Sequence, residues 1–323
     1  MNGKYLAYGA MIATFLISSL LMPQIIKYFR AKQLGQTTRD EGPKWHQTKS
    51  GTPTMGGVVI IVATVIVGVL GLIFFPKDRW YLSLILSTFL FFGGIGFIDD
   101  YIILIKKQNE GLTSRQKFLA QVVGGLFVFL MLMFLRQPTI LNLPFIHWQL
   151  PTFIYGFLVV FWVVGFSNAT NLTDGIDGLM ASNGAIAYMA YSAIAATQER
   201  YDLMFFSLSV VGALLGFYLY NKKPAQIFMG DVGSLALGAG LAVLSILLFA
   251  EWTLLFIGFI YVIETASVML QVAYFKKTGQ RLFKMTPIHH HFEMSGWSEQ
   301  QIVTRFDLVT LVAAAIAIWG MLV

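Results

Sequence analysis

Long runs of apolar residues, separated by short polar connectors, recur along the whole chain. Ten of these runs are long enough, or nearly so, to cross about 30 Å of hydrocarbon as helices that rise about 1.5 Å per residue. They occupy residues 5–26, 55–75, 80–98, 118–135, 152–167, 179–197, 203–220, 232–249, 252–275 and 306–323. We therefore predict an all-α, polytopic membrane protein with about ten transmembrane helices, built as a single integral membrane domain over residues 1–323.

The basic residues predict which way these helices cross the bilayer. Of the 22 Lys and Arg residues, 17 fall on alternate connectors on one side of the predicted membrane. The other side, with the N-terminus, carries only Lys4, Lys77, Arg79, Arg136 and Arg200. Cytoplasmic loops are enriched in Lys and Arg, so the strongly basic side is the inner one. Both termini are then outside, and five loops face the cytoplasm.

Composition supports a membrane protein and excludes other classes. Hydrophobic residues make up 57% of the chain and charged residues 12%, against roughly 25% charged residues in soluble domains. The net charge is +6, but the basic excess lies at membrane boundaries, where it suits anionic headgroups better than nucleic acid. Cysteine is absent, which excludes disulfides and a thiolate nucleophile.

Acidic residues gather at the predicted cytoplasmic helix ends. Asp99 and Asp100 directly follow the third apolar run. Two adjacent carboxylates at a helix C-terminus are disfavoured by the helix dipole and by each other. A metal ion, or a lysine such as Lys106 or Lys107, would offset this repulsion. The alternative is a solvated helix end without function.

A second polar segment, residues 168–178, carries Asn171, Asp174 and Asp177 among threonines and glycines. Unpaired polar groups are costly in hydrocarbon, so this segment must lie in the interface or line a wet cavity. Its glycines allow close backbone approach to a ligand, and amides before a new helix suit phosphate oxygens. An N-cap explains one of the carboxylates but not the whole group.

A third segment, residues 221–234, contains Asn221, Phe228 and Asp231. Asp231 begins the eighth predicted helix, either as its N-cap or as a functional group. Phe228 either stacks on a nucleotide base or fills apolar space. Lys49, before the second run, either neutralises a phosphate or simply marks the cytoplasmic boundary.

The last cytoplasmic loop contains His289, His290 and His291 in succession. Three consecutive histidines cannot all ligate one metal in regular geometry, which argues against a three-histidine zinc site. At a polar cytoplasmic site, imidazoles that hydrogen-bond phosphate oxygens are the favoured interpretation. The alternative is a loop with three solvated histidines. Glu264 lies within the ninth run, and an acid at membrane depth should face a polar groove or a break in its helix.

These clusters together describe a site for a polyanion and a hard divalent cation. Mg²⁺ is bound by a few carboxylates plus substrate phosphates, and Asp99, Asp100, Asp174 and Asp231 supply enough of them. Because phosphoryl transfer needs little beyond positioning and charge neutralisation, the residues predict a Mg²⁺-dependent phosphotransferase at the inner leaflet. The rival class is an ion-coupled transporter, which would place several ionisable groups near mid-bilayer.

Four ordered motifs resemble the polyprenyl-phosphate N-acetylhexosamine-1-phosphate transferase superfamily. They are Phe-Ile-Asp-Asp-Tyr at 97–101, Asn-Leu-Thr-Asp-Gly-Ile-Asp-Gly at 171–178, Phe-Met-Gly-Asp-Val-Gly-Ser at 228–234 and Pro-Ile-His-His-His-Phe-Glu at 287–293. The resemblance covers essentially the whole chain. The histidine motif favours the branch that transfers phospho-N-acetylmuramoyl-pentapeptide over a transferase that uses UDP-N-acetylglucosamine and the same lipid.

The resemblance implies that UDP-N-acetylmuramoyl-pentapeptide and undecaprenyl phosphate react, with Mg²⁺, to give UMP and lipid I. This is a step of peptidoglycan synthesis, so the expected location is the bacterial cytoplasmic (inner) membrane, with multiple passes through the bilayer. A homodimer and a broken ninth helix are also implied.

Roles for individual residues follow from the same resemblance. Asp231 is expected to be the principal metal ligand, and the expected catalytic and metal-binding group around the reacting phosphates is completed by Asp99, Asp100 and His289. Substrate binding is expected of Lys49, Asn171, Asp174, Asp177, Asn221, Phe228, His290 and His291. Two mechanisms remain open: an Asp attacks the donor's β-phosphate to form a covalent intermediate, or Asp99 or Asp100 deprotonates the lipid phosphate, which attacks directly.

Overall fold

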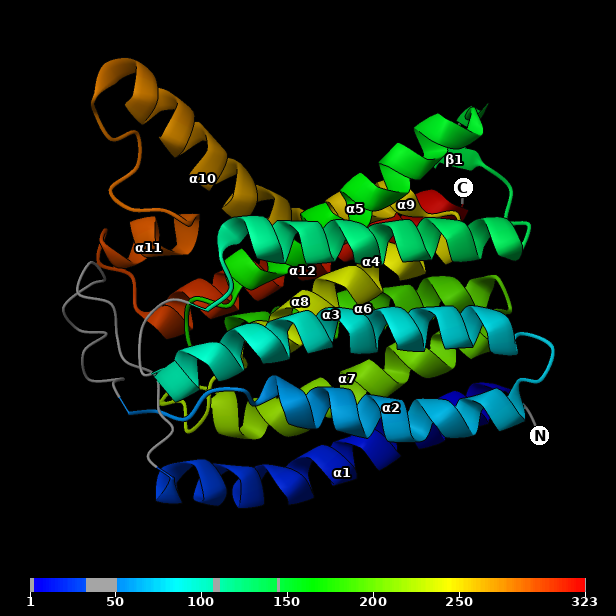
Figure 1. The fold of residues 1–323 in the computed structure, drawn as a ribbon, viewed down its shortest axis with the longest axis horizontal. Helices are drawn as coiled ribbons and strands as arrows, with labels where there is room; N and C mark the ends of the chain where they lie inside the picture. Colours follow the sequence, from blue (N-terminus) through cyan, green and yellow to red (C-terminus); the bar gives the residue numbers. More distant parts are fainter. Residues whose placement is uncertain (1–2, 33–50, 107–110, 144–145, 323) are drawn as a thin grey trace.

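The computed structural model describes residues 3–32, 51–106, 111–143 and 146–322. Most of them form helices that run side by side in one bundle (Figure 1). In chain order the elements are α1 (Gly3–Ala31), α2 (Gly57–Phe74), α3 (Arg79–Lys106), α4 (Ser114–Phe134), β1 (Ile140–Leu143), β2 (Ile146–Gln149), α5 (Thr152–Thr173), α6 (Leu179–Thr197), α7 (Tyr201–Asn221), α8 (Gly230–Leu247), α9 (Glu251–Ile257), α10 (Phe259–Thr278), α11 (Ile288–Glu293) and α12 (Glu299–Leu322).

The polytopic architecture is confirmed. Among the described residues, eight helices are long and apolar enough to cross a membrane, and α9 with α10 makes a ninth if the bent pair is one span. The remaining predicted run is α6, which packs beside α7 and α12. Polar side chains such as Asn183 and Ser192 are buried there and make α6 less apolar than its neighbours. Most residues of α6 are buried inside the bundle, and Met189 is exposed.

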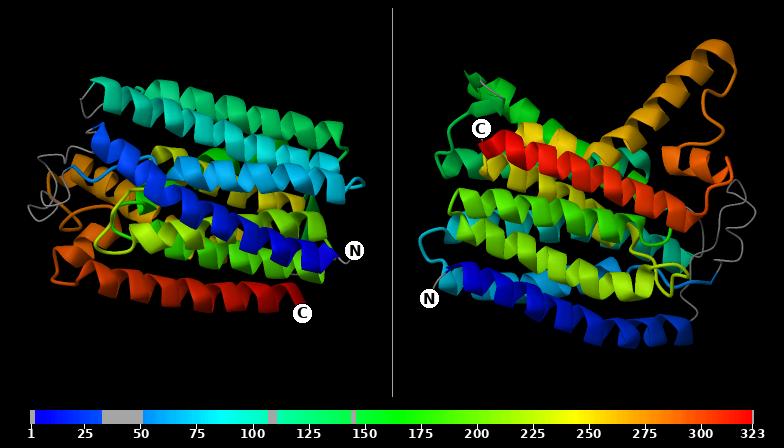
Figure 2. Two further views of the ribbon diagram at one scale, coloured as in Figure 1. Left: turned by 90° about the horizontal axis from the view of Figure 1, so that it is seen from below. Right: turned by 180° about the vertical axis from the view of Figure 1, so that it is seen from behind.

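The two ends of the bundle differ. Both chain termini lie at one end, and α11 lies at the opposite end, together with the ends of α3 and α10 (Figure 2). This matches the prediction that the termini share one side of the membrane and the polar clusters share the other. We call the end with the termini the outer end and the end with α11 the inner end.

Helix α8 lies at the centre of the bundle. Every residue from Val232 to Leu247 is buried, and α8 packs against α2, α3 and α5. Small residues such as Gly238 let these neighbours approach closely, because a Cβ there would collide with the carbonyl of Phe166 on α5. The first turn of α8, which contains Asp231, is thereby surrounded by other helices.

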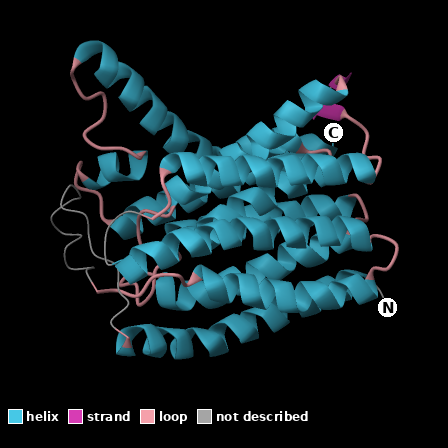
Figure 3. Ribbon diagram, viewed as in Figure 1, coloured by secondary structure: helices cyan, strands magenta, loops and turns pink. Residues whose placement is uncertain are grey.

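The ninth predicted run is broken, as the resemblance implies. α9 and α10 meet at Gly258 with a bend of 78°, and α10 then projects from the bundle (Figure 1). A feature absent from the sequence prediction is the antiparallel hairpin of β1 and β2, in which Ile140 pairs with Gln149. Figure 3 shows this hairpin at the outer end, within the predicted outer connector.

Candidate active site

The acidic residues predicted to be functional meet where α3 crosses the start of α8. A Cβ at Gly96 of α3 would collide with the carbonyl of Asp231, so the two backbones touch at this point. Asp99 and Asp100 lie one helical turn further along α3 and are therefore beside Asp231. The prediction that they end the third helix is wrong, because α3 continues to Lys106.

Three carboxylates form the centre of the site. Asp99, Asp100 and Asp231 each offer an oxygen that lies within 4.8 Å of the other two. Asp99 and Asp100 are buried and Asp231 is half-buried. Like charges this close repel each other, and carboxylate oxygens are the preferred ligands of hard divalent cations. The three residues can therefore hold a metal ion.

Lys117 supplies a positive charge to this cluster. Its ammonium lies 3.4 Å from Asp99 Oδ2 and forms a second ion pair with Asp231. A capping box between Thr113 and Gln116 begins α4 and places Lys117 in its first turn. The predicted cation was Lys106 or Lys107, and Lys117 was not predicted. Lys107 and the side chain of Lys106 lie outside the described residues.

Backbone groups fix Asp100. The amide of Val232 donates to Asp100 Oδ2 at 3.2 Å, and the neighbouring Gly230 has a φ of +75°. A Cβ at Gly230 would collide with the Asp100 carboxylate. Only glycine fits here without strain, because the turn that starts α8 passes directly over Asp100.

Asn171 joins the cluster from α5. Its Nδ2 donates to Asp231 Oδ1 at 2.7 Å and to Ser234 Oγ at 2.9 Å. The prediction of a polar connector from residue 168 is wrong, because α5 continues to Thr173. The helix tolerates these polar residues because other helices pair with them, as Gln121 does with Asn168 at 2.8 Å.

Asp174 follows α5 and is turned toward the cluster. Burial and the nearby carboxylates of Asp231 and Asp100 raise its pKa well above the usual value. An N-cap role for Asp174 or Asp177 is not observed, because Gly178 caps α6 without a side-chain hydrogen bond. Asp174 thus adds a fourth carboxyl group close to the three that can hold a metal.

Asp177 and Asn221 brace the surrounding loops. The carboxylate of Asp177 accepts a hydrogen bond from the amide of Ala225 at 3.0 Å. Asn221 accepts one from the amide of Gly178 at 3.1 Å and donates to the carbonyl of Ile227 at 2.9 Å. The predicted segments 168–178 and 221–234 are therefore bonded to each other at the inner end.

A third loop joins them. The amide of Phe228 donates to the carbonyl of Pro53 at 2.8 Å, and the amide of Gly56 donates back to Phe228 at 2.9 Å. Phe228 is half-buried. It lies two residues before Gly230, the first residue of α8. Lys49, predicted to bind substrate, lies outside the described residues.

The three histidines have three different partners. His289 Nδ1 lies 3.0 Å from Glu264 Oε1, and His290 Nδ1 lies 2.7 Å from Glu293 Oε2. His291 Nδ1 accepts a hydrogen bond from the amide of Lys284 at 3.2 Å. Each histidine therefore has a partner of its own, and Glu264 faces a polar group beside the helix break, as predicted.

His289 is the histidine nearest to the carboxylate region. It is fully buried, and its Nε2 has no hydrogen-bond partner among the described residues. A Cβ at Gly175 would collide with this nitrogen, so the turn that carries Asp174 lies against the imidazole. The pair with Glu264 thus holds Nε2 toward the turn next to the cluster.

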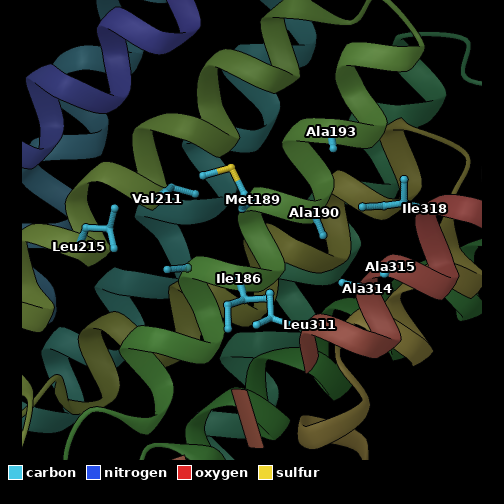
Figure 4. Close-up of a pocket in the computed structure, with 11 residues that line it drawn as sticks. Ile186, Met189, Ala190, Ala193, Val211, Leu215, Leu311, Ala314, Ala315 and Ile318 are labelled. Carbon is cyan, nitrogen blue, oxygen red and sulfur yellow. The ribbon is translucent and has the colours of Figure 1, made fainter. Parts of the chain in front are cut away.

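A separate cavity of about 410 Å³ lies between α6, α7 and α12. Its lining is apolar and includes Ile186, Met189, Leu215 and Leu311 (Figure 4). Without a charged or hydrogen-bonding side chain in that lining, it offers no group for phosphate chemistry.

Comparison with known proteins gives a consistent family. The model of glycosyl transferase family 4 matches residues 81–249, and the phospho-N-acetylmuramoyl-pentapeptide-transferase signature 1 matches residues 49–61. The first match includes Asp99, Asp100, Lys117, Asp174 and Asp231. The second includes the loop bonded to Phe228.

Three curated relatives are similar over nearly their whole length, and each is a phospho-N-acetylmuramoyl-pentapeptide-transferase. That of Enterococcus hirae is 53% identical over 92% of this chain and 93% of its own. The relative from Lactiplantibacillus plantarum is 52% identical over 97% of this chain and 98% of its own. That of Enterococcus faecalis is 50% identical over 95% and 96%.

Proposed function

The chain belongs to the phospho-N-acetylmuramoyl-pentapeptide-transferase family, and from this premise we propose how its inner-end site carries out the reaction. The protein is a multi-pass enzyme of the bacterial cytoplasmic membrane. It transfers phospho-N-acetylmuramoyl-pentapeptide from the UDP-activated donor to undecaprenyl phosphate. The products are lipid I, a precursor of peptidoglycan, and UMP.

The observation that carries this proposal is the cluster of Asp99, Asp100 and Asp231, whose oxygens lie within 4.8 Å of one another. We assign Mg²⁺ to it, because a set of a few carboxylates leaves the remaining positions to water and substrate phosphates, as Mg²⁺ prefers. When bound, Mg²⁺ neutralises charge on the reacting phosphates. The fit rests on the donor atoms, which are all carboxylate oxygens.

Lys117 has a related role. Its ammonium pairs with both Asp99 and Asp231, so it reduces repulsion between two of the ligands and keeps a positive charge beside the reacting groups. Two negative charges still remain in excess over the one lysine. A negatively charged cluster repels a negatively charged phosphate, so the site can accept the pyrophosphate of the donor only together with a further cation.

We propose direct transfer. A phosphate monoester has a second pKa near 6, so most of the lipid phosphate is already ionised at neutral pH. One of its oxygens forms a bond to the donor's β-phosphorus, and the bond from that phosphorus to the bridging oxygen breaks, which releases UMP. Asp99 or Asp100 takes the proton of the minority monoanion. A phospho-sugar adduct trapped on the enzyme without lipid acceptor would instead support the covalent route.

The remaining residues are assigned to the donor. Asn171 orients Asp231, and Asp174 lies beside it. Asp177 and Asn221 hold the loops that carry Phe228, which we assign to the uridine ring. His289, His290 and His291, with Lys49, are assigned to the phosphates and the sugar. On the family resemblance we also propose a homodimer, which cross-linking in native membranes can test.

The test is release of UMP by the purified protein in detergent. With UDP-N-acetylmuramoyl-pentapeptide, undecaprenyl phosphate and Mg²⁺, we expect release that stops when Mg²⁺ is chelated. Asp78→Asn, which changes a half-buried acid in the connector between α2 and α3, serves as a matched control and should retain activity. Release with UDP-N-acetylglucosamine but not with the muramoyl donor would overturn the donor assignment.

A further inference from the structure

The second half of α10 projects from the bundle (Figure 1), and several of its apolar side chains are exposed. Met269, Leu270, Val272 and Phe275 are between 47% and 67% exposed. On a membrane protein, such a surface faces acyl chains. The inner end of α10 therefore lies at the level of the headgroups, outside the packed bundle.

Four basic residues follow directly on this apolar surface. Lys276 and Lys277 are in the last turn of α10, and Arg281 and Lys284 are in the segment after it. All four are exposed, and within the described part of the chain none of them forms an ion pair with a carboxylate. From residue 265 to residue 292 the sequence contains no Asp or Glu. We call these four residues the α10 tip.

The turn after α10 is folded so that its charges stay together. Gly279 caps the C-terminus of α10 with a φ of +70°, which reverses the chain. Gln271 Oε1 then accepts hydrogen bonds from the amides of Leu282 at 3.0 Å and Phe283 at 2.8 Å. This returns the segment alongside the helix. Lys284 Nζ donates to the carbonyl of Met294 at 3.1 Å, which ties the tip to the end of α11.

We propose that the α10 tip binds the phosphates of anionic bilayer phospholipids, with phosphatidylglycerol as the representative headgroup. The charges are complementary, and an arginine can grip a phosphate with two parallel hydrogen bonds. The apolar surface of α10 enters the acyl region while the lysines reach the headgroups, the arrangement expected at an anionic leaflet. Neither the transferase reaction nor the carboxylate cluster uses these four residues.

The occupant is a bilayer lipid rather than nucleic acid or the lipid substrate. A nucleic acid could not follow the tip without contacting the acyl chains beside Phe275. The phosphate of the lipid substrate belongs, in the proposed reaction, at the carboxylate cluster, which lies within the bundle. The lipids that surround α10 are present at far higher concentration.

Native mass spectrometry of the full-length protein in detergent measures this binding directly. Phosphatidylglycerol, phosphatidylcholine and undecaprenyl phosphate are titrated separately. The variant Lys276→Gln/Lys277→Gln/Arg281→Gln/Lys284→Gln should lose phosphatidylglycerol affinity by a factor on the order of ten or more. Its binding of phosphatidylcholine and undecaprenyl phosphate should stay within about twofold of the unmodified protein.

The matched control is Lys27→Gln/Arg30→Gln/Lys32→Gln, which removes three exposed charges at the inner end of α1. It should keep most of the phosphatidylglycerol affinity. The milder Lys276→Gln/Lys277→Gln should reduce the logarithm of the phosphatidylglycerol affinity by about half as much as the fourfold variant does. This second variant guards against misfolding of the larger one. Unchanged phosphatidylglycerol binding in the tip variants would overturn the proposal, as would an equal loss in the α1 control or an equal loss of undecaprenyl phosphate. Because binding is measured without substrate turnover, the result is independent of the proposed reaction.

Discussion

At the outer end of the bundle the buried Asp202 is held by Arg200, whereas at the inner end one lysine pairs with two of three clustered aspartates. Asp202 is 1% exposed and is bound by Arg200 through two hydrogen bonds, of 3.0 and 2.8 Å. Arg200 also lies 4.7 Å from the centre of the Tyr81 ring. Two hydrogen bonds from one cation satisfy this carboxylate, so the outer pair needs no further ligand.

The inner cluster of Asp99, Asp100 and Asp231 is different because its carboxylates outnumber the positive charge of Lys117. Burial of such excess charge costs stability unless a cation joins it. The comparison shows that a buried acid alone does not indicate a functional site. An unbalanced group of acids at one end of the bundle is a better indicator, because a bound cation can offset its mutual repulsion.

The largest effect is expected for Asp231→Asn. It removes the charge of a proposed metal ligand and of the partner of Lys117, so kcat for UMP release should fall by roughly a thousandfold or more. The protein should remain folded, because one less charge relieves repulsion within the cluster. Thermal unfolding provides the check on folding. Activity within tenfold of the unmodified enzyme would refute the assignment of Asp231.

At the outer end, Arg200→Met should act on stability instead. It leaves the buried Asp202 without its partner, which should lower the free energy of unfolding by about 3–5 kcal/mol. Below the melting temperature, kcat and KM should be unchanged. The double variant Arg200→Met/Asp202→Leu should recover much of the lost stability. If Arg200→Met lowered kcat in a fully folded sample, the distinction between the two ends would fail.

Lys117→Gln separates the roles of the lysine and the metal. The loss of a positive charge beside the phosphates should lower kcat by about a hundredfold. Mg²⁺ should bind more tightly, because the cluster then holds more uncompensated negative charge. The measurement is UMP release over a range of Mg²⁺ concentrations, with Lys117→Arg as the charge-preserving control. A higher Mg²⁺ requirement would contradict this account.

A smaller effect is expected for Glu264→Gln. Glutamine keeps an oxygen that can accept the hydrogen bond from His289 but removes the negative charge, so kcat should fall by about tenfold. Because glutamine keeps a hydrogen-bond acceptor for His289, the imidazole should stay in place and KM should change less than kcat. Glu199→Gln, at an exposed position of the outer end, is the control. Equal changes in kcat for both variants would argue against a positioning role for Glu264.

Much of the fold could be predicted from the sequence because apolar run length encodes the spans directly. All ten predicted runs correspond to helices, and the break at Gly258 agrees with the resemblance. The run that became α6 was predicted as a span like the others, although Asn183 within it is buried against α12 and hydrogen-bonds Thr310 at 2.7 Å. The hairpin of β1 and β2 depends on pairing within a short outer connector, which apolar run length does not report.

The candidate site was predicted less completely. Clustering of polar residues at the predicted inner helix ends was sufficient to select Asp99, Asp100 and Asp231. Lys117 was missed because its link to Asp231 spans 114 positions in sequence. The capping box at Thr113 was the available signal, since it predicts where α4 starts. The bracing roles of Asp177 and Asn221 depend on loop packing, which spacing in sequence does not specify.

The most direct test of the central claim, that the unbalanced inner cluster holds a divalent cation, is calorimetric titration of Mg²⁺ into the purified protein without substrates. The unmodified protein and the outer-end variant Asp78→Asn should bind Mg²⁺ with the same affinity. Asp231→Asn should bind at least about tenfold more weakly, because one of three ligands has lost its charge. Equal affinity in Asp231→Asn and the unmodified protein would contradict the account.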